Sequence, residues 1–234
     1  MSVARLDNGD FRTNLRGCVA IEVLLPNGEV AMGTGFHVGE GVFLTARHVL
    51  EGNIINAILA KAPGVLMTPD EIAAGLTLMG EPVFHPDQNV DVAAFRVSDL
   101  ISDTPVLQLG GHYDDWINDE QWLLSEAIAF GYPPIPSARD AILVVDRVRV
   151  NAVVDTYRDH YVRFVVSGAP RGGFSGGPVY HEWGFVLGMI TESLERQGEA
   201  PSSGYLTVLS IEALFECLDH HDMLPACQNL EMKD

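Results

Sequence analysis

The sequence predicts an all-β protein of two antiparallel β-barrels followed by a C-terminal helix. Short apolar segments recur between turns throughout the chain, which has 23 glycines and 13 prolines among its 234 residues. A polar, acidic segment at residues 110–122 divides these segments into two similar groups. Clear helical periodicity occurs near the C-terminus, at residues 210–220. These three observations favour two β-rich halves over an α/β or helical arrangement.

The first group of strands is expected at residues 17–109, after an N-terminal extension at residues 1–16. The segment CVAIEVLLPNGEV, from Cys18, is typical of a strand, a Pro-Asn-Gly turn and a returning strand. Two further strands are expected on either side of Gly39-Glu40-Gly41. The remaining strands of this half are expected near residues 55–59, 83–85 and 92–97.

The second group is expected at residues 123–209, after a connection at residues 110–122. Its strands are expected near residues 127–132, 141–154, 161–166, 185–191 and 205–209, and Pro178 is expected to begin another ordered strand. Residues 210–234 are expected to form a helix and a tail. Ser210 is the predicted helix cap, and the apolar side chains of this helix share one face: Ile211, Leu214, Phe215 and Leu218.

The composition restricts the classes of partner. A hydrophobic content of 47% supports a buried core. The net charge of −18 argues against a nucleic-acid partner, because affinity for phosphates depends on Lys and Arg, and it also repels anionic membranes. The N-terminal residues have no apolar core of a signal peptide, and no apolar run is long enough for a bilayer. We therefore expect a cytoplasmic protein without a membrane partner.

The three cysteines, Cys18, Cys217 and Cys227, are poor material for a disulfide framework and suit a reducing compartment. Cys217 and Cys227 flank His220 and His221, and such side chains are able to bind zinc. Their spacing is not one of the familiar paired forms, however, and Cys217 falls on the expected helix. We therefore interpret the histidines as surface residues at a helix end and predict no metal site.

Glycines are concentrated around Ser175 in the segment GGFSGGPV, at residues 172–179. Glycine is enriched where the main chain needs unusual dihedral angles or a close approach. The segment is compatible with a flexible turn between two strands. It is equally compatible with a nucleophile loop whose NH groups point at the oxygen of a reacting carbonyl. Ser175 alone does not decide between these alternatives.

A serine nucleophile needs a base, and the base needs a third group that fixes its tautomer. His48 follows an apolar strand in FLTARHVL and is expected on a single helical turn. Asp91 begins an apolar segment in NVDVAAFRV, where a half-buried carboxylate needs a partner. Taken alone, His48 is most simply a structural histidine and Asp91 a turn aspartate. The order of histidine, aspartate and glycine-flanked serine favours catalysis.

Four segments resemble the chymotrypsin/trypsin-like serine peptidases, in their bacterial HtrA-type or glutamyl-endopeptidase-like form. They are GTGFHVGEGVFLTARHV, HPDQNVDVAAFRV, AFGYPP and GGFSGGPVYHEWGFVLGMIT. The resemblance extends over residues 17–218. It implies two six-stranded β-barrels, with His48 and Asp91 in the first barrel and Ser175 in the second.

The resemblance also implies a mechanism. Ser175 would attack the scissile carbonyl, His48 would take and return its proton, and Asp91 would orient His48. The NH groups of Gly173 and Ser175 would form the oxyanion hole. The substrate would be a protein or peptide, and the chemistry requires neither a metal nor an organic cofactor.

The expected substrate pocket is formed by three segments, which contain Ala169, then Thr191, Glu192 and Ser193, and finally Gly204. Ala169 stands where trypsin-type members carry the acidic residue that selects Lys or Arg. We therefore expect a neutral pocket of modest size for small or apolar side chains.

Phe174 departs from the pattern of animal digestive members, which have an aspartate there that pairs with a freed N-terminus. A chain without that charge pair is expected to need no N-terminal cleavage. Some regulated members hold the oxyanion hole malformed until a partner binds, so a regulatory protein partner is an open alternative. Two further alternatives are a catalytically silent trypsin fold used for binding and a hydrolase of esters or other acyl groups.

Overall fold

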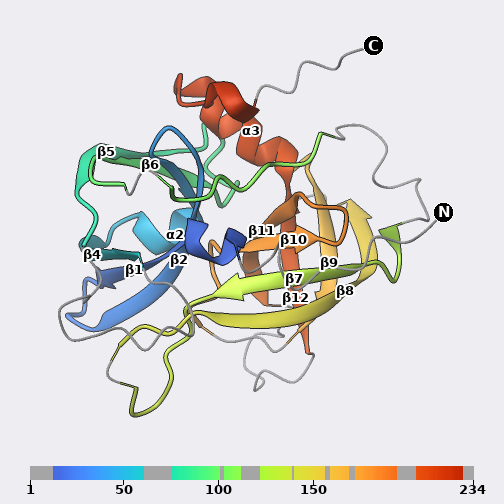
Figure 1. Ribbon diagram of the computed structural model, residues 1–234, viewed down its shortest axis with the longest axis horizontal. Coiled ribbons are helices and arrows are strands. Elements are labelled where there is room, and N and C mark those ends of the chain that lie inside the picture. Colours follow the sequence, from blue (N-terminus) through green and yellow to red (C-terminus); the bar gives the residue numbers. More distant parts are fainter. Residues whose placement is uncertain are drawn as a thin grey trace.

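Two β-sheets of six strands each lie side by side, and helix α3 (Ile211–His220) lies across one end of both (Figure 1). The computed structural model describes residues 13–60, 75–100, 103–111, 122–138, 140–155, 159–168, 172–193 and 204–228. The expected N-terminal extension and the connection at residues 110–122 lie mostly outside these ranges. The all-β prediction with a C-terminal helix is confirmed.

The first sheet has the strand order β4-β1-β2-β3-β6-β5, and all its neighbours are antiparallel. Its strands are β1 (Cys18–Leu24), β2 (Val30–Gly39), β3 (Val42–Thr45), β4 (Ile54–Ala60), β5 (Leu78–Phe84) and β6 (Ala93–Val97). Glu40 and Gly41 both have positive φ, as the tight turn between β2 and β3 requires. Strand β5 begins earlier than expected, because exposed residues around Gly80 interrupt its apolar alternation.

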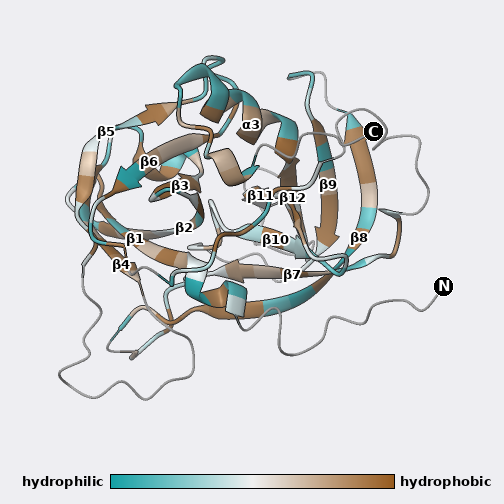
Figure 2. Cartoon of the chain, turned by 45° about the horizontal axis from the view of Figure 1, so that its top comes forward, coloured by the Kyte–Doolittle hydropathy of each residue, from teal (hydrophilic) through white to brown (hydrophobic). Residues whose placement is uncertain are grey.

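The second sheet is a closed barrel with the strand order β10-β11-β12-β9-β8-β7. Its strands are β7 (Glu126–Gly131), β8 (Val144–Asp155), β9 (Val162–Ser167), β10 (Pro178–His181), β11 (Val186–Ser193) and β12 (Tyr205–Ser210). All six strands contribute buried apolar residues, and Figure 2 shows brown, hydrophobic stretches along them. The closed barrel is a rigid frame for the loop that carries Ser175, which leads directly into β10.

Ser210 does not cap helix α3 with its side chain, so that prediction is wrong. The residue occupies the N-cap position, but its hydroxyl is fully buried and finds no hydrogen-bond partner among the residues that the structure describes. The reason is that β12 continues through Ser210, where it pairs with Gly188 of β11 before the helix begins. The predicted apolar face is confirmed, with Ile211, Leu214 and Leu218 buried.

The C-terminal 3-10 turn η4 (Ala226–Gln228) is tied to the first sheet through a buried side chain. Gln228 donates hydrogen bonds to the carbonyls of Val38 and Leu107, at 2.8 Å and 3.0 Å, and accepts one from Leu109 N at 2.9 Å. Because each polar atom of this buried amide is paired, the tie fixes the segment after α3 against β2.

All three cysteines are free thiols. Cys18 and Cys217 are buried, and burial raises the pKa of Cys217 to about 12. The described residues hold no group of three or more His, Cys, Asp or Glu side chains suited to a metal ion. His221 instead donates to the carbonyl of Phe84 at 2.7 Å. Within the described ranges, no helix is long and apolar enough to cross a membrane.

His181 of β10 is fully buried among aromatic rings, including those of Trp122 and Phe185. Its Nδ1 accepts a hydrogen bond from Trp183 N at 3.3 Å, whereas its Nε2 has no partner among the described residues. Desolvation by burial lowers the pKa of His181 from 6.5 to about 4. The folded state therefore holds the neutral imidazole, and acid must charge it.

We expect the free energy of unfolding to include a contribution from neutral His181 that is complete above pH 6.5 and lost as the pH falls to 4. The full loss is roughly 3 kcal/mol, from 1.36 kcal/mol per pKa unit. Urea unfolding at pH 7 and pH 4 measures it, with His181→Phe as the comparison. Because the other titrating groups are the same in both proteins, the free energy of unfolding should fall less between pH 7 and pH 4 in the variant than in the wild type. Equal falls would contradict the role of His181.

Candidate active site

His48 and Asp91 form a close pair that the first sheet positions. Strand β3 leads into the single helical turn α2 (Arg47–Leu50), and the antiparallel neighbour of β3 is β6, which Asp91 precedes. Asp91 Oδ2 lies 2.7 Å from His48 Nδ1, and Asp91 Oδ1 accepts a hydrogen bond from His48 N at 2.9 Å. The carboxylate therefore favours a proton on Nδ1 and leaves Nε2 as the basic nitrogen.

Arg47 anchors the loop that carries Asp91. Its guanidinium is nearly buried and donates to the main-chain carbonyls of His85, Asp87 and Val90. Since this residue directly precedes His48, one side chain connects the turn that carries the histidine to the loop that carries the aspartate.

Replacing Arg47 with glutamine is expected to lower the free energy of unfolding by about 3–5 kcal/mol, because several buried carbonyls would lose their donor. Urea denaturation measures the change. Arg149→Gln is a matched control, because the Arg149 side chain is 60% exposed and its ion pair with Glu126 should contribute less than about 1 kcal/mol. Similar losses in the two variants would contradict this role of Arg47.

A second network, which runs from buried His85 to half-exposed Glu216, joins the same loop to the C-terminal helix. The Nδ1 atom of His85 accepts a hydrogen bond from Asp87 N at 3.1 Å, so its Nε2 carries the proton and lies 3.1 Å from the hydroxyl of Tyr161. That hydroxyl donates in turn to Glu216 of α3. Burial and the Glu216 carboxylate raise the pKa of Tyr161 above its ordinary value. Helix α3 thereby supports the loop before Asp91 through contacts with both halves of the molecule.

The loop with Ser175 is seated against the first sheet. Thr34 N donates to Ser175 O at 2.9 Å, and Gly176 N donates to Ile190 O at 2.8 Å. A Cβ atom on Gly176 would lie 2.3 Å from Thr34 O and 2.8 Å from Ala46 N. The main chain next to Ser175 therefore lies against Ala46, two residues before His48.

Gly176→Ala is expected to reduce activity and stability together. Gly176 has a φ of +81°, which alanine adopts with strain, and the added Cβ would overlap main-chain atoms of Thr34. Steric overlap of this kind typically costs about 1–3 kcal/mol and would move Ser175 away from α2. Thermal unfolding and peptide hydrolysis measure the two effects. Gly172→Ala is the matched control, because its Cβ would meet nothing within 4 Å. Equal activity of the two variants would contradict the expectation.

Thr34 also holds the loop through its side chain. The hydroxyl donates to Gly173 O at 2.6 Å and accepts from Tyr132 N at 3.0 Å. Gly173 itself has a φ of +92°. Among the described residues, the NH groups of Gly173 and Ser175 have no hydrogen-bond acceptor. An oxyanion hole requires two such unpaired donors.

Phe174 lies inside the protein, where its side chain is 3% exposed. A Cβ atom on Gly131 would lie 2.6 Å from its ring, so the aromatic side chain rests directly on strand β7. Gly177 N donates to Phe174 O at 2.8 Å. Apolar packing thus fixes the residue between Gly173 and Ser175.

The segments expected to form the substrate pocket meet through strand pairing. Strand β12 pairs with β11, which contains Thr191, and with β9, and Gly204 O accepts a hydrogen bond from Gly168 N at 2.9 Å. Thr191 is buried. Ala169 and the side chains of Glu192 and Ser193 lie outside the described part, so the neutral pocket stays a prediction.

Four residues that support the site were not predicted from the sequence: Thr34, Arg47, Tyr161 and Glu216. His85 was predicted only as part of the segment that contains Asp91. The local signal that could have found Thr34 is the pair of glycines that flank it in strand β2. Arg47 is next to His48, but nothing in the sequence shows that its charge is buried. Tyr161 and Glu216 carry no local signal, because their roles arise from contacts across 55 residues or more.

Among solved structures, the chain is similar to the active form of the Rv3671c protease from M. tuberculosis, with 20% identity and a TM-score of 0.65 over 92% of this chain and 84% of that one. The inactive form of that protease gives a TM-score of 0.62 at 20% identity, over 92% and 93% of the two chains. The HtrA-type protease AlgW with a tripeptide has 18% identity and a TM-score of 0.60, over 92% of this chain and 64% of that chain. These likenesses show the fold.

No match was found among the curated proteins. The family model of the trypsin-like peptidase domain matches residues 33–189, a range that contains His48, Asp91 and Ser175. The match covers more than half of the chain and extends from within β2 of the first sheet to within β11 of the second. The chain therefore belongs to the family of trypsin-like peptidase domains and is a serine endopeptidase by class.

Proposed function

We propose that this chain hydrolyses peptide bonds with Ser175 as nucleophile, His48 as general base and Asp91 as the group that orients His48. The observation that carries the proposal is the His48–Asp91 pair, bonded through both carboxylate oxygens, beside a loop whose Gly176 lies against Ala46. A serine, a base and an orienting acid in this relation form the general arrangement for acyl transfer.

The steps follow from these positions. His48 Nε2 takes the proton of Ser175 as its oxygen attacks the scissile carbonyl, and the tetrahedral oxyanion is stabilised by the NH groups of Gly173 and Ser175. His48 then gives the proton to the leaving amine, and an acyl-enzyme remains on Ser175. Water, deprotonated by His48, hydrolyses the ester and releases the second product.

The packing of Phe174 supports an oxyanion loop that is ordered without N-terminal processing. A buried ammonium group beside an apolar ring would be strongly unfavourable, so no charge pair of the digestive type fits there. We further propose a cytoplasmic location, which the three free thiols support, and small or apolar residues as the preferred P1 side chains.

Cleavage of a peptide library by the purified full chain, read by mass spectrometry, tests the proposed function. The wild type should cut within the peptides, after small or apolar residues, while His48→Ala should leave them intact. His160→Ala is the control, because His160 lies outside the proposed site. Cleavage that persists in His48→Ala, or no cleavage by any of these proteins, would overturn the proposal.

A further inference from the structure

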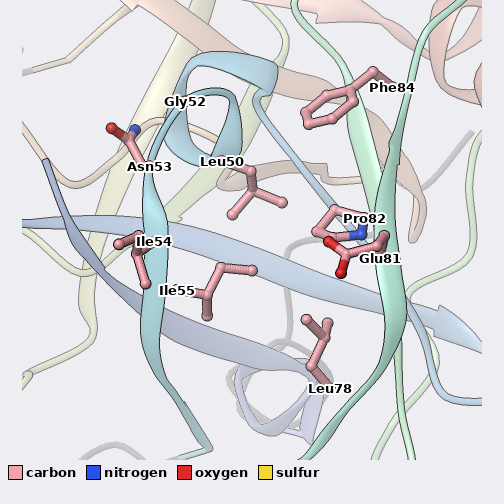
Figure 3. A pocket seen from close by; sticks show the side chains of 9 residues that line it. All are labelled: Leu50, Gly52, Asn53, Ile54, Ile55, Leu78, Glu81, Pro82 and Phe84. Carbon is pink, nitrogen blue, oxygen red and sulfur yellow. The ribbon is translucent and has the colours of Figure 1, made fainter. Parts of the chain in front are cut away.

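A groove opens on the first sheet between its two end strands, β4 and β5. Its volume is about 400 Å³, and most of the side chains that line it are apolar, although its walls expose polar and apolar surface in similar measure. Figure 3 shows Leu50, Ile55 and Leu78 pointing into the space between the two strands. The lining residues come from the end of α2, from β4 and from β5: Leu50, Gly52, Asn53, Ile54, Ile55, Leu78, Glu81, Pro82 and Phe84.

Strand β4 is an end strand of the first sheet, and its outer edge borders this groove. Among the described residues, its contacts on that side are a bridge between Leu59 and Gly75 and the hydrogen bond from Leu76 N to Ile58 O. Within the part of the chain that the structure describes, the edge at residues 54–57 therefore has no strand partner. An unpaired edge with neither proline nor charge is a template for another extended chain.

Strand β5 is a poorer template, although it forms the opposite wall. Gly80 has a φ of +74°, and the register of β5 against β6 shifts between Met79 and Val83. Pro82 has no NH group to donate. Such irregularities typically blunt an exposed edge, so an added strand would pair with β4 and pack its side chains against β5.

Exposed apolar residues continue from the groove over the neighbouring strands. Ile54 is 67% exposed, and its cross-strand neighbour Leu24 is paired in turn with Val30, which is 62% exposed. Directly opposed residues lie on the same face of a sheet, so the three side chains form one row. An exposed apolar row beside a groove is typical of an interaction surface.

Among the residues that line the groove, Glu81 is the acidic one, and it has no ion-pair partner among the described residues. Glu51, which lies between the lining residues Leu50 and Gly52, is paired with Arg47 at 3.1 Å. The only Lys or Arg within residues 18–60 and 75–84 is Arg47, which is buried and bonded to main-chain carbonyls. An occupant with Lys or Arg would complement this charge, while an acidic one would be repelled.

We propose that the groove binds an extended segment of a partner protein, which adds a strand to the β4 edge, places apolar side chains against Leu78 and Phe84, and sets a Lys or Arg opposite Glu81. The free edge requires an extended main chain, the lining requires apolar side chains, and the unpaired carboxylate requires a cation. Together they define the occupant as a basic, apolar β-strand.

This segment would act on the active site, a step that rests on the proposed function. Asn53 lines the groove and donates to the carbonyls of His48 and Val49, at 3.2 Å and 3.0 Å. Phe84, on the other wall, directly precedes His85. The centre of its ring lies 5.2 Å from Arg47 Cζ, so the guanidinium lies over the ring. A segment bound between Asn53 and Phe84 would contact the residue that is bonded to the His48 turn and the residue that packs against Arg47, which anchors the Asp91 loop. Its binding would therefore change the position of the His48–Asp91 pair and regulate turnover.

The test begins with the full chain carrying Ser175→Ala, which binds peptides without cutting them. A phage library of random peptides, roughly twelve residues long, is selected on it, and one selected peptide is synthesised with a fluorophore. Its Kd is then measured by anisotropy on Ser175→Ala alone and with Glu81→Lys, Ile54→Ser or Asp155→Lys added. Glu81, Ile54 and Asp155 are all exposed, and Asp155 serves as the control because it lies on β8 of the other sheet.

The expected peptides alternate apolar residues and carry a Lys or Arg. Glu81→Lys should raise Kd at least tenfold and Ile54→Ser at least threefold, while Asp155→Lys should leave it within twofold. Hydrogen exchange should show new protection of amides at residues 54–57. The proposed binding site would be overturned by any of three results: selected peptides without this pattern, equal Kd values for Glu81→Lys and Asp155→Lys, or hydrogen-exchange protection confined to residues around Ser175.

The regulatory step is read separately, on the wild type with a short substrate. Saturating peptide should change kcat at least threefold with little change in KM. Unchanged kcat in an active enzyme would overturn the regulation. Binding is measured on Ser175→Ala and does not depend on activity. An inactive wild type would therefore count against the proposed function but would not change the result on binding.

Discussion

Replacing Ser175 with alanine is expected to lower kcat for peptide hydrolysis by about 10⁶-fold, the size of loss known for nucleophile removal in another serine peptidase. The substitution removes only the attacking oxygen. The main-chain bonds that seat the loop, from Thr34 N to Ser175 O and from Gly176 N to Ile190 O, do not involve the side chain. The thermal unfolding midpoint should therefore stay within about 2 °C of the wild type.

A fluorogenic peptide assay with single-turnover sensitivity measures the loss, and circular dichroism follows unfolding. Ser98→Ala, a change at an exposed serine after β6, should have wild-type activity. If Ser175→Ala retained more than a hundredth of the wild-type rate, the nucleophile would be another residue.

Asp91→Asn is expected to lower kcat by roughly 10⁴-fold while preserving the fold. The amide oxygen can replace Asp91 Oδ1 as the acceptor for His48 N, so the loop stays in place. The amide NH₂ group then faces His48 Nδ1, where Asp91 Oδ2 now lies at 2.7 Å. A donor at this position makes Nδ1 an acceptor and puts the proton on Nε2, which then cannot take the proton of Ser175.

The measurement is kcat across pH 6–9, with Asp99→Asn, a change at an exposed carboxylate, as the matched control. The deficit should be greatest near neutral pH, where general-base catalysis depends on the imidazole. A loss below tenfold would mean that a different carboxylate orients His48.

Much of the fold follows from local sequence patterns. Alternating apolar residues predicted most of the strands, because a half-buried strand needs apolar and polar side chains in alternation. Glycines predicted the turns, because a tight turn such as that at Glu40 and Gly41 needs positive φ. The open edge between β4 and β5 has no such signal, since alternation does not show which strands are paired. The role of Ser210 was missed for a related reason: its burial depends on pairing with Gly188.

The candidate site was predictable where a residue type and its neighbours carry the chemistry. His48, Asp91 and Ser175 each stand in a distinctive local segment, and the structure places His48 against Asp91. Thr34 was not predictable, because its hydroxyl acts on Gly173, which is 139 residues away in the chain. Supports of this kind depend on tertiary contacts, and a single sequence does not encode them locally.

In the proposed mechanism, Ser175 is a nucleophile that His48 activates without N-terminal processing of the chain. Labelling of the unprocessed protein with a fluorophosphonate, followed by peptide mapping, tests this claim. We expect one adduct, on Ser175, with a rate that rises as the imidazole becomes neutral, and essentially no adduct in His48→Ala. An adduct on another serine, equal labelling of His48→Ala, or no labelling of the wild type would contradict the claim.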